Sequence, residues 1–190
     1  MEFTNSHRLQ LLEGEARACK ECELSIARNQ VVFASGPFDS QLVVVGEAPG
    51  AAEDRDGLPF IGRSGQLLTR LIEEELGLQR SDYYITNVVK CRPQGNRKPL
   101  SVEIDACSRY LRGQLENLTG GVVLAVGEVA ARALTNHKGS LASVRGTVLF
   151  VGGKRVVVTY HPAYALRGGR RVEQAMRSDL SVVGGLLSGK

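Results

Sequence analysis

Short apolar runs that alternate with stretches of helical periodicity constrain the fold of this chain most strongly. We expect strands at 41–45, 83–89, 122–126, 147–151 and 154–160, and helices at 6–18, 64–78, 101–118, 128–135 and 172–187. Ser101 is placed to cap the third helix. Strands that alternate with helices are typical of a layered α/β fold with a mainly parallel sheet. No repeat or linker interrupts the pattern, so we expect residues 1–190 to form one domain.

Three polar motifs stand at the ends of the expected strands: residues 46–50, Thr86–Asn87 and His161–Pro162. In parallel sheets the ligand crevice lies beyond the C-terminal ends of the strands, so these motifs predict one site at that edge. The loop at 53–65 holds glycines, three acids and one aromatic ring. Such a loop suits a pocket in which backbone amides and a ring hold a flat polar ligand. The Gly/Pro turn at 46–50 alone is equally compatible with a structural role.

The four cysteines are Cys19, Cys22, Cys91 and Cys107. Without a visible secretory signal, two disulfides are the less expected use of them. The C-x2-C spacing of the first pair lets two thiolates reach one metal, and the second pair can close a four-thiolate site. Zinc and an iron–sulfur cluster both fit this pattern, and a set of unrelated buried thiols is the structural alternative.

Charge is distributed unevenly along the chain. Residues 1–89 contain 8 Lys and Arg against 14 Asp and Glu, whereas residues 90–190 contain 16 against 6. The basic half indicates a phosphate-facing surface, because Lys and Arg bind polyanions by releasing counterions. A solvated surface with a mild basic bias is the alternative. No apolar run approaches the length of a membrane span, so we expect a soluble cytoplasmic protein with no membrane partner.

Longer motifs carry a family resemblance. The chain reads GEAPGAAEDRDGLPFIGRSGQLL from Gly46, ITNVVKCRP from Ile85 and HPAYALR from His161. Together with the positions of the four cysteines, these motifs resemble the family-4 uracil-DNA glycosylases over nearly the whole chain. The resemblance implies a three-layer α/β/α fold with a mainly parallel sheet of about four strands. It also implies a DNA-repair enzyme that hydrolyses the N-glycosidic bond of uracil in DNA, releasing free uracil and leaving an abasic site.

The same resemblance implies the cofactor and the partners. The cofactor is a [4Fe–4S] cluster that lies away from the chemistry, and its ligands are Cys19, Cys22, Cys91 and Cys107. The partner is uracil-containing DNA, and enzymes that repair abasic sites can act downstream. We expect a monomer that associates with the nucleoid.

Physical chemistry supports roles for three of the matching residues. Asn87 offers an amide that can pair with uracil N3–H and O4 while rejecting the amino group of cytosine. Phe60 offers a face for the flipped base, and His161 can donate to uracil O2, where charge grows as the base departs. The structural alternatives are a strand-end cap for the asparagine, core packing for the phenylalanine and a turn for the histidine. The rest of the expected uracil-binding set is Gly46, Glu47, Ala48, Pro49, Gly50 and Glu53.

A carboxylate is needed to stabilise the oxocarbenium-like sugar or to orient water. The best-known uracil glycosylases have Asp at the position of Ala48, although the family-4 pattern itself has Ala there. We therefore expect Glu47 to take this role, with Glu53 or Asp54 in reserve. Gly50 replaces the large tyrosine that excludes thymine in the better-known group, so Glu53 is expected to form a wall beside C5. A solvated or loop-bracing role for that residue is the alternative.

The segment after His161 carries the expected DNA contacts. Leu166 can fill the space that the flipped base leaves, while Arg167, Arg170 and Arg171 bind phosphates. An ordinary basic loop is the alternative. A sister group that traps uracil-DNA covalently carries a longer basic insert with a histidine after the second strand. Here that segment is only the polar loop at 92–99, without histidine, so covalent capture is not expected.

Two other functions remain open from the sequence. One is a glycosylase of the same superfamily with a broader scope of deaminated bases, such as hypoxanthine or xanthine. The other is a metal-containing nucleotide- or DNA-binding module without turnover. The joint presence of Glu47, Asn87 and His161 favours an enzyme.

Overall fold

The computed structural model describes residues 4–189 and is built around one six-stranded sheet in the order β1-β3-β2-β4-β6-β5. The four central strands run parallel: β3 (Tyr84–Asn87), β2 (Leu42–Gly46), β4 (Val122–Val126) and β6 (Lys154–Thr159). The edge strands β1 (Ala34–Ser35) and β5 (Val148–Val151) pair antiparallel with their neighbours. The expected mainly parallel α/β sheet is therefore confirmed, with two antiparallel edges added to its four parallel strands.

Nine α-helices and one short 3-10 turn accompany these strands within residues 4–189. The helices are α1 (Asn5–Ala18), α2 (Leu24–Ala27), α3 (Ala51–Asp56), α4 (Arg63–Leu76), α5 (Ser101–Asn117), α6 (Glu128–Thr135), α7 (Leu141–Val144), α8 (Pro162–Gly168) and α9 (Arg170–Leu187), and the 3-10 turn is Gln94–Asn96. None of these helices is long and apolar enough to cross a membrane.

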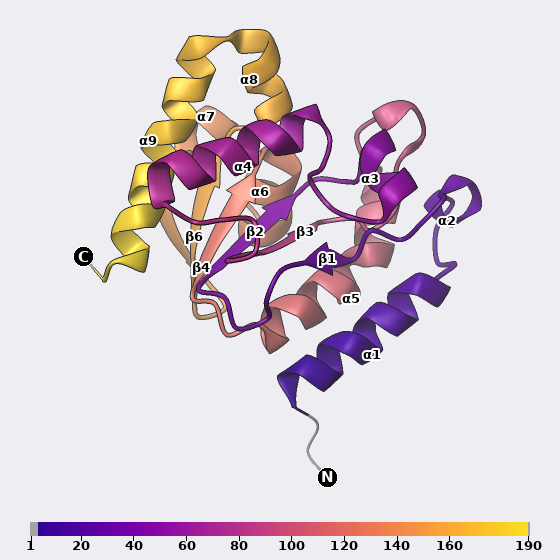
Figure 1. The fold of residues 1–190 in the computed structure, drawn as a ribbon. Helices are drawn as coiled ribbons and strands as arrows, with labels where there is room; N and C mark the ends of the chain where they lie inside the picture. The colour runs from indigo at the N-terminus through magenta and orange to yellow at the C-terminus, as the bar shows by residue number, and fades with distance from the viewer. Residues whose placement is uncertain (1–3, 190) are drawn as a thin grey trace.

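Two apolar clusters, one on each face of the sheet, give the molecule its three layers. Successive residues of β2 point to opposite faces, as in any strand. Val43 and Val45 therefore pack in the cluster that includes side chains of α1, α5 and α6. Leu42 and Val44 pack in the cluster that includes side chains of α4 and α9. Figure 1 shows α4 crossing in front of the sheet beside α8 and α9, with α1 lying along α5 on the other side.

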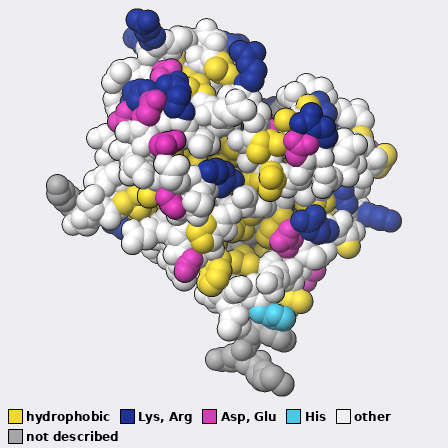
Figure 2. Space-filling view, in the orientation of Figure 1, with side chains coloured by type: hydrophobic (Ala, Val, Ile, Leu, Met, Phe, Trp, Pro, Cys, Tyr) yellow, Lys and Arg dark blue, Asp and Glu magenta, His cyan; other side chains and the backbone are white. Residues whose placement is uncertain are grey.

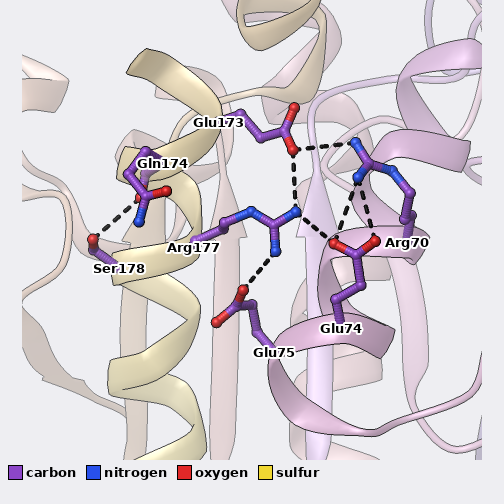
Figure 3. A network of polar contacts seen from close by, with 7 residues as sticks. All are labelled: Arg70, Glu74, Glu75, Glu173, Gln174, Arg177 and Ser178. Atoms are coloured by element: carbon purple, nitrogen blue, oxygen red, sulfur yellow. Dashed lines mark hydrogen bonds and ion pairs between the residues drawn. The ribbon is translucent and has the colours of Figure 1, made fainter. Parts of the chain in front are cut away.

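An ion-pair network fastens α9 to α4 (Figure 3). Arg177 of α9 binds Glu74 and Glu75 of α4, as well as Glu173 one turn earlier in its own helix. Arg70 of α4 also binds Glu74 and Glu173, which makes the network continuous. A single exposed ion pair is worth only about 0–1 kcal/mol, but a network of this kind fixes the relative placement of the two helices. That placement sets the position of α8, which precedes α9 directly.

The structure corrects three expectations about the helices. The N-cap of α5 is Leu100, not Ser101, because the buried Glu103 carboxylate accepts from the Leu100 backbone N–H at 2.8 Å. Helix α3 lies in the segment expected to be a loop, and its backbone ends in the left-handed conformation at Gly57. No helix was expected between His161 and residue 172, but α8 covers most of that segment and α9 begins at Arg170, two residues before the expected start.

Candidate active site

A cleft of about 480 Å³ opens at the carboxyl edge of the parallel strands. Its walls come from the turn after β2, the loop before α4, the end of β3, the loop at 93–97 and the first turns of α8. The lining residues are Glu47, Ala48, Pro49, Gly50, Glu53, Phe60, Ser64, Asn87, Pro93, Asn96, Arg97, His161, Ala163, Tyr164 and Arg167. The structure thus brings together, in one place, nearly all of the base-binding residues expected from the sequence. A larger hollow at the opposite end of the sheet is lined by none of them.

Asn87 is the last residue of β3, and its side chain is buried with 2% exposure. Its Oδ1 has no hydrogen-bond partner among residues 4–189. A buried acceptor without a partner is costly, so this oxygen is available for a donor on a ligand. Gly46, its register partner on β2, makes the arrangement possible. A Cβ on Gly46 would lie 2.5 Å from Asn87 Oδ1 and 2.3 Å from Cζ of Phe60.

The Phe60 ring lies beside this amide, and its backbone is held in an unusual conformation. Its φ of 59° is in the left-handed region, which costs a non-glycine residue about 1–3 kcal/mol. Gly65 of α4 packs directly against the same residue, since a Cβ there would lie 2.0 Å from the Phe60 carbonyl oxygen. The fold therefore maintains local strain to keep an aromatic ring in the cleft, and residues held in this way cluster at binding sites.

His161 follows β6 and forms the N-cap of α8. Its Nδ1 accepts from the backbone N–H of Ala163 at 3.2 Å, so the proton of the neutral ring resides on Nε2. Burial, together with the positive charge of Arg167, lowers the pKa of His161 to about 4. The ring is therefore neutral at physiological pH, with one N–H to donate. A neutral imidazole donor can stabilise an anion without being itself a strong acid.

Glu47 contributes one of the two carboxylates that line the cleft, the other being Glu53. Burial raises the pKa of this half-buried carboxyl group, while the cation of Lys98 opposes the shift and the charge of Glu128 adds to it. Lys98 is held in place by an ion pair with Glu128 at 2.9 Å. Glu47 is therefore a more basic carboxylate than one on the surface, which suits the acceptance of a proton from water.

Glu53 and Asp54 have other partners. The Glu53 carboxylate accepts from the backbone N–H groups of Gly62 at 2.7 Å and Gly50 at 3.1 Å, which joins the two loops that line the cleft. This is the bracing role that the sequence left as an alternative, and the contact with C5 of a base stays a prediction. Asp54 lies outside the cleft lining, and its carboxylate accepts from the backbone and side chain of Asn29. It is therefore removed as a reserve candidate for orienting water.

Several lining residues were not expected from the sequence, among them Asn96 and Arg97 from the loop at 93–99. Asn96 is held by its own loop. It has a positive φ of 54° at the end of the short 3-10 turn, and its Oδ1 accepts from Nε of Arg92 at 2.8 Å. The Gly-Asn pair that forms this turn is visible in the sequence as a turn signal. Nothing in the sequence alone indicates that the turn faces the cleft.

The expected DNA-contacting residues lie at the corner between α8 and α9. Leu166 is 48% exposed. Arg167 lines the cleft, whereas Arg170 and Arg171 lie outside it, exposed in the first turn of α9. None of these three arginines forms an ion pair within the described part of the chain. Figure 2 shows basic side chains projecting at the top of the molecule, where α8 and the start of α9 lie in Figure 1.

The four cysteines line a second, separate cavity, which shares no residue with the cleft. All four are free thiols, and Cys91 and Cys107 are buried. Within residues 4–189, no three His, Cys, Asp or Glu side chains are arranged to hold a single metal ion. The thiols instead surround a common space, as a polynuclear cluster requires, because each iron of a [4Fe–4S] cluster takes its own cysteine.

Hydrogen-bond donors reach the sulfur atoms of this cavity. Nη1 of Arg28 lies 3.2 Å from Sγ of Cys91, and the backbone N–H of Lys90 lies 3.3 Å from Sγ of Cys107. Burial raises the pKa of Cys107 to about 11 and also raises that of Cys91. A bound metal would therefore supply the positive charge that thiolates need in this apolar setting. The chemistry of the donor set fits an iron–sulfur cluster.

An open α/β sheet with an amide, an aromatic ring and a neutral imidazole at its carboxyl edge offers the groups that suit a flat polar ring. Comparison with known families agrees, since the model of the uracil DNA glycosylase superfamily matches residues 33–180. The chain belongs to this superfamily and, by its relatives, to the type-4 uracil-DNA glycosylase family.

Three type-4 uracil-DNA glycosylases illustrate the relationship. The protein of Thermotoga maritima is 41% identical over 167 residues, which cover 87% of this chain and 86% of that protein. The protein of Archaeoglobus fulgidus is 38% identical over 184 residues, or 93% and 92% of the two chains. The protein of Saccharolobus solfataricus is 42% identical over 166 residues, or 83% and 77%. The family expected from the sequence motifs is thereby confirmed.

Proposed function

We propose that this chain is a DNA-repair enzyme that hydrolyses the N-glycosidic bond of uracil in DNA, releasing free uracil and leaving an abasic site. The observation that carries the proposal is the unpartnered Oδ1 of Asn87, which is buried in the cleft next to the Phe60 ring. Enzymes that act on a base in DNA must flip it out of the stack and read its edge in such a pocket.

Asn87 selects the base. Its Oδ1 accepts from N3–H of uracil, and its Nδ2 donates to O4. Cytosine has an unprotonated N3 and an amino group at C4, so neither of these hydrogen bonds could form and buried polar groups would remain unpaired. Unpaired buried groups are the basis of strong discrimination between similar ligands.

His161 stabilises the leaving group. As the bond between C1′ and N1 breaks, its electron pair leaves with the base, and negative charge spreads onto O2. The Nε2–H of the neutral ring donates to that oxygen. A preorganised donor of this kind typically contributes about 3 kcal/mol to lowering the barrier.

Glu47 serves the sugar side of the reaction. The sugar acquires positive charge as the base departs, and water then adds to C1′. The Glu47 carboxylate accepts the proton that this water loses and stabilises the charge on the sugar. Glu53 supports the site by holding the loops at Gly50 and Gly62 together.

The cysteine cavity is proposed to hold a [4Fe–4S] cluster on Cys19, Cys22, Cys91 and Cys107. When bound, the cluster supplies a structural crosslink between the segment after α1, the segment after β3 and α5. Because its cavity shares no residue with the cleft, no catalytic step is assigned to it.

DNA is proposed to bind across the corner between α8 and α9. Leu166 fills the space left by the flipped base, and Arg167, Arg170 and Arg171 bind phosphates. The exposure of the leucine and the absence of ion pairs at the three arginines within residues 4–189 support this assignment.

A panel of duplex oligonucleotides tests the proposal against its alternatives. Each duplex carries uracil, hypoxanthine, xanthine, thymine or cytosine at one position, and the free base released is measured. Release of uracil alone is the expected result. Release of hypoxanthine or xanthine at a comparable rate would establish the broader glycosylase. Binding of the uracil duplex without release of any base would establish the non-catalytic module.

A further inference from the structure

A lysine with no place in the proposed chemistry is buried beneath the cleft. Lys90 is 1% exposed and lies outside the cleft lining, three residues beyond Asn87. Its Nζ reaches back to the backbone oxygen of Asn87 at the end of β3, and Lys90 also lines the cysteine cavity. Lysine is almost never fully buried unless its charge is compensated, so this placement calls for an explanation.

The ammonium group is fully satisfied by three acceptors. Nζ of Lys90 donates to the backbone oxygen of Asn87 at 2.6 Å, to Oε1 of Gln114 at 2.6 Å and to Oγ1 of Thr86 at 2.8 Å. The Thr86 hydroxyl gives its own hydrogen to the carbonyl of Phe33 at 2.7 Å, so it accepts from the lysine. Three donors therefore meet three acceptors, as an ammonium group requires.

Two of these three hydrogen bonds fall on consecutive residues at the end of β3. Asn87 carries the amide that the proposed function assigns to base recognition, and Thr86 precedes it in the strand. A hydrogen bond to the Asn87 carbonyl fixes the peptide from which that amide projects. Catalytic geometry is sensitive to such support, since small misplacements of a reacting group have large effects on rate.

Gln114 anchors the same lysine to the helical layer. It is fully buried in α5, and its Nε2 donates to the hydroxyl of Tyr84 at 3.0 Å and to the carbonyl of Phe33 at 3.2 Å. The network thus joins α5 to both ends of the short strand β3. Fully satisfied buried networks of this kind rigidify the elements they connect.

We propose that Lys90 is a positioning residue, which holds the end of β3 so that the Asn87 amide keeps its place in the cleft. This inference rests on the proposed function, because it assumes that Asn87 reads the base. Lys90 does not touch the base itself and acts only through Asn87.

The test is a double-mutant cycle on single-turnover release of uracil. Lys90→Met removes the ammonium group but keeps most of the length of the side chain. We expect it to slow release by about 10²-fold, with DNA affinity unchanged. If Lys90 acts through Asn87, the double variant N87A/K90M is no slower than N87A alone. His161 contributes to the rate independently of Lys90. Adding K90M to His161→Ala should therefore slow release further, by the full factor that K90M causes on its own.

A second lysine provides the matched control. Nζ of Lys154 is likewise held by protein acceptors, the backbone carbonyls of Leu118 and Gly120, but at the opposite end of the sheet. Lys154→Met should release uracil at the parent rate. A parent protein that releases no uracil would refute the proposed function itself. Two results with an active parent would overturn only the role of Lys90. In the first, K90M releases uracil as fast as the parent. In the second, N87A/K90M is slower than N87A by the same factor that separates K90M from the parent.

Folding is checked by circular dichroism before the kinetics. If K90M is recovered unfolded, K90M/Q114L takes its place, because the second substitution removes the buried Gln114 oxygen that K90M leaves without its lysine donor. The double replacement should fold and still release uracil about 10²-fold more slowly than the parent. A folded K90M/Q114L with the parent rate would overturn the proposal.

Discussion

The placement of single side chains in the cleft depends on neighbouring glycines, which have no side chain of their own. Asn87 and Phe60 can face each other only because residue 46 has no side chain, and Phe60 can keep its positive φ only because Gly65 leaves room for its carbonyl. These glycines were part of the sequence motifs, but their purpose is steric and emerges only from the distances in the folded chain.

Gly46→Ala should therefore abolish most uracil release. The added Cβ would collide with both the amide and the ring, and overpacking of this kind typically costs about 1–3 kcal/mol. Gly14→Ala is the matched control, since a Cβ at that position meets nothing within 4 Å. Single-turnover rates of the two variants give the comparison, and equal rates would show that the cleft tolerates a side chain at position 46.

The pH dependence of release should report Glu47. Because the carboxylate form is needed to accept a proton, the rate falls as pH drops through the pKa of Glu47, which burial has raised. The Lys98 cation lowers that pKa, so Lys98→Met should move the acid limb of the profile to higher pH. Lys138→Met, which changes an exposed lysine, should leave the limb in place. If the acid limb does not move in K98M, the limb reports the titration of a group other than Glu47.

At the scale of elements, sequence periodicity predicted the long helices and the buried strands, whereas the short helices depend on tertiary contacts. β4 and α6 have the predicted bounds, because a buried valine run and a strongly amphipathic helix are determined by local sequence. α3 and α8 contain 6 and 7 residues, too few for a periodic signal. The Ser101 cap was wrong because the helix begins at Ser101 itself, with Leu100 at the N-cap and the Glu103 carboxylate accepting from the Leu100 backbone N–H.

The corner between α8 and α9 is the part of the fold that is proposed to bind DNA phosphates. Charge reversal at Arg167 and Arg170 should weaken binding to DNA of any sequence, because phosphate contacts carry no base information. The slope of log affinity against log salt should become shallower by about 0.9 for each phosphate that is no longer neutralised. Charge reversal at Arg55, which pairs with Asp56 on the surface, is the control. An unchanged salt slope in the double reversal would place the phosphate-binding residues elsewhere.

Across the whole molecule, the charge asymmetry of the sequence is partly neutralised by folding. Acids of the first half, such as Glu74 and Glu75, bind Arg177 of the second half, as Figure 3 shows. Counting charge along the chain therefore overstated the basic surface that remains.

The site itself was predictable in its main residues, because the motifs follow strand ends that meet at one edge. The place of Asn96 in the cleft and the contacts of Lys90 were not predictable, since they depend on where a turn and a side chain lie in the folded chain.

The separation of the two cavities leads to a prediction about the metal. Protein purified without oxygen should contain about four irons per chain and absorb broadly at ~400 nm. Cys91→Ala should lower yield and thermal stability before it alters the single-turnover rate of the protein that survives. Stoichiometric zinc without iron, in protein never exposed to oxidants, would contradict the cluster assignment.

Single-turnover release of free uracil from a duplex with uracil opposite guanine tests the central claim most directly. The parent protein should release one uracil for each abasic site formed and none of the thymine in the same duplex. His161→Ala should release it about 10²–10³-fold more slowly with little change in DNA affinity, because the ring stabilises charge that exists only as the bond breaks. A parent that binds this duplex and releases no uracil, or a His161→Ala variant that cleaves at the parent rate, would contradict the account.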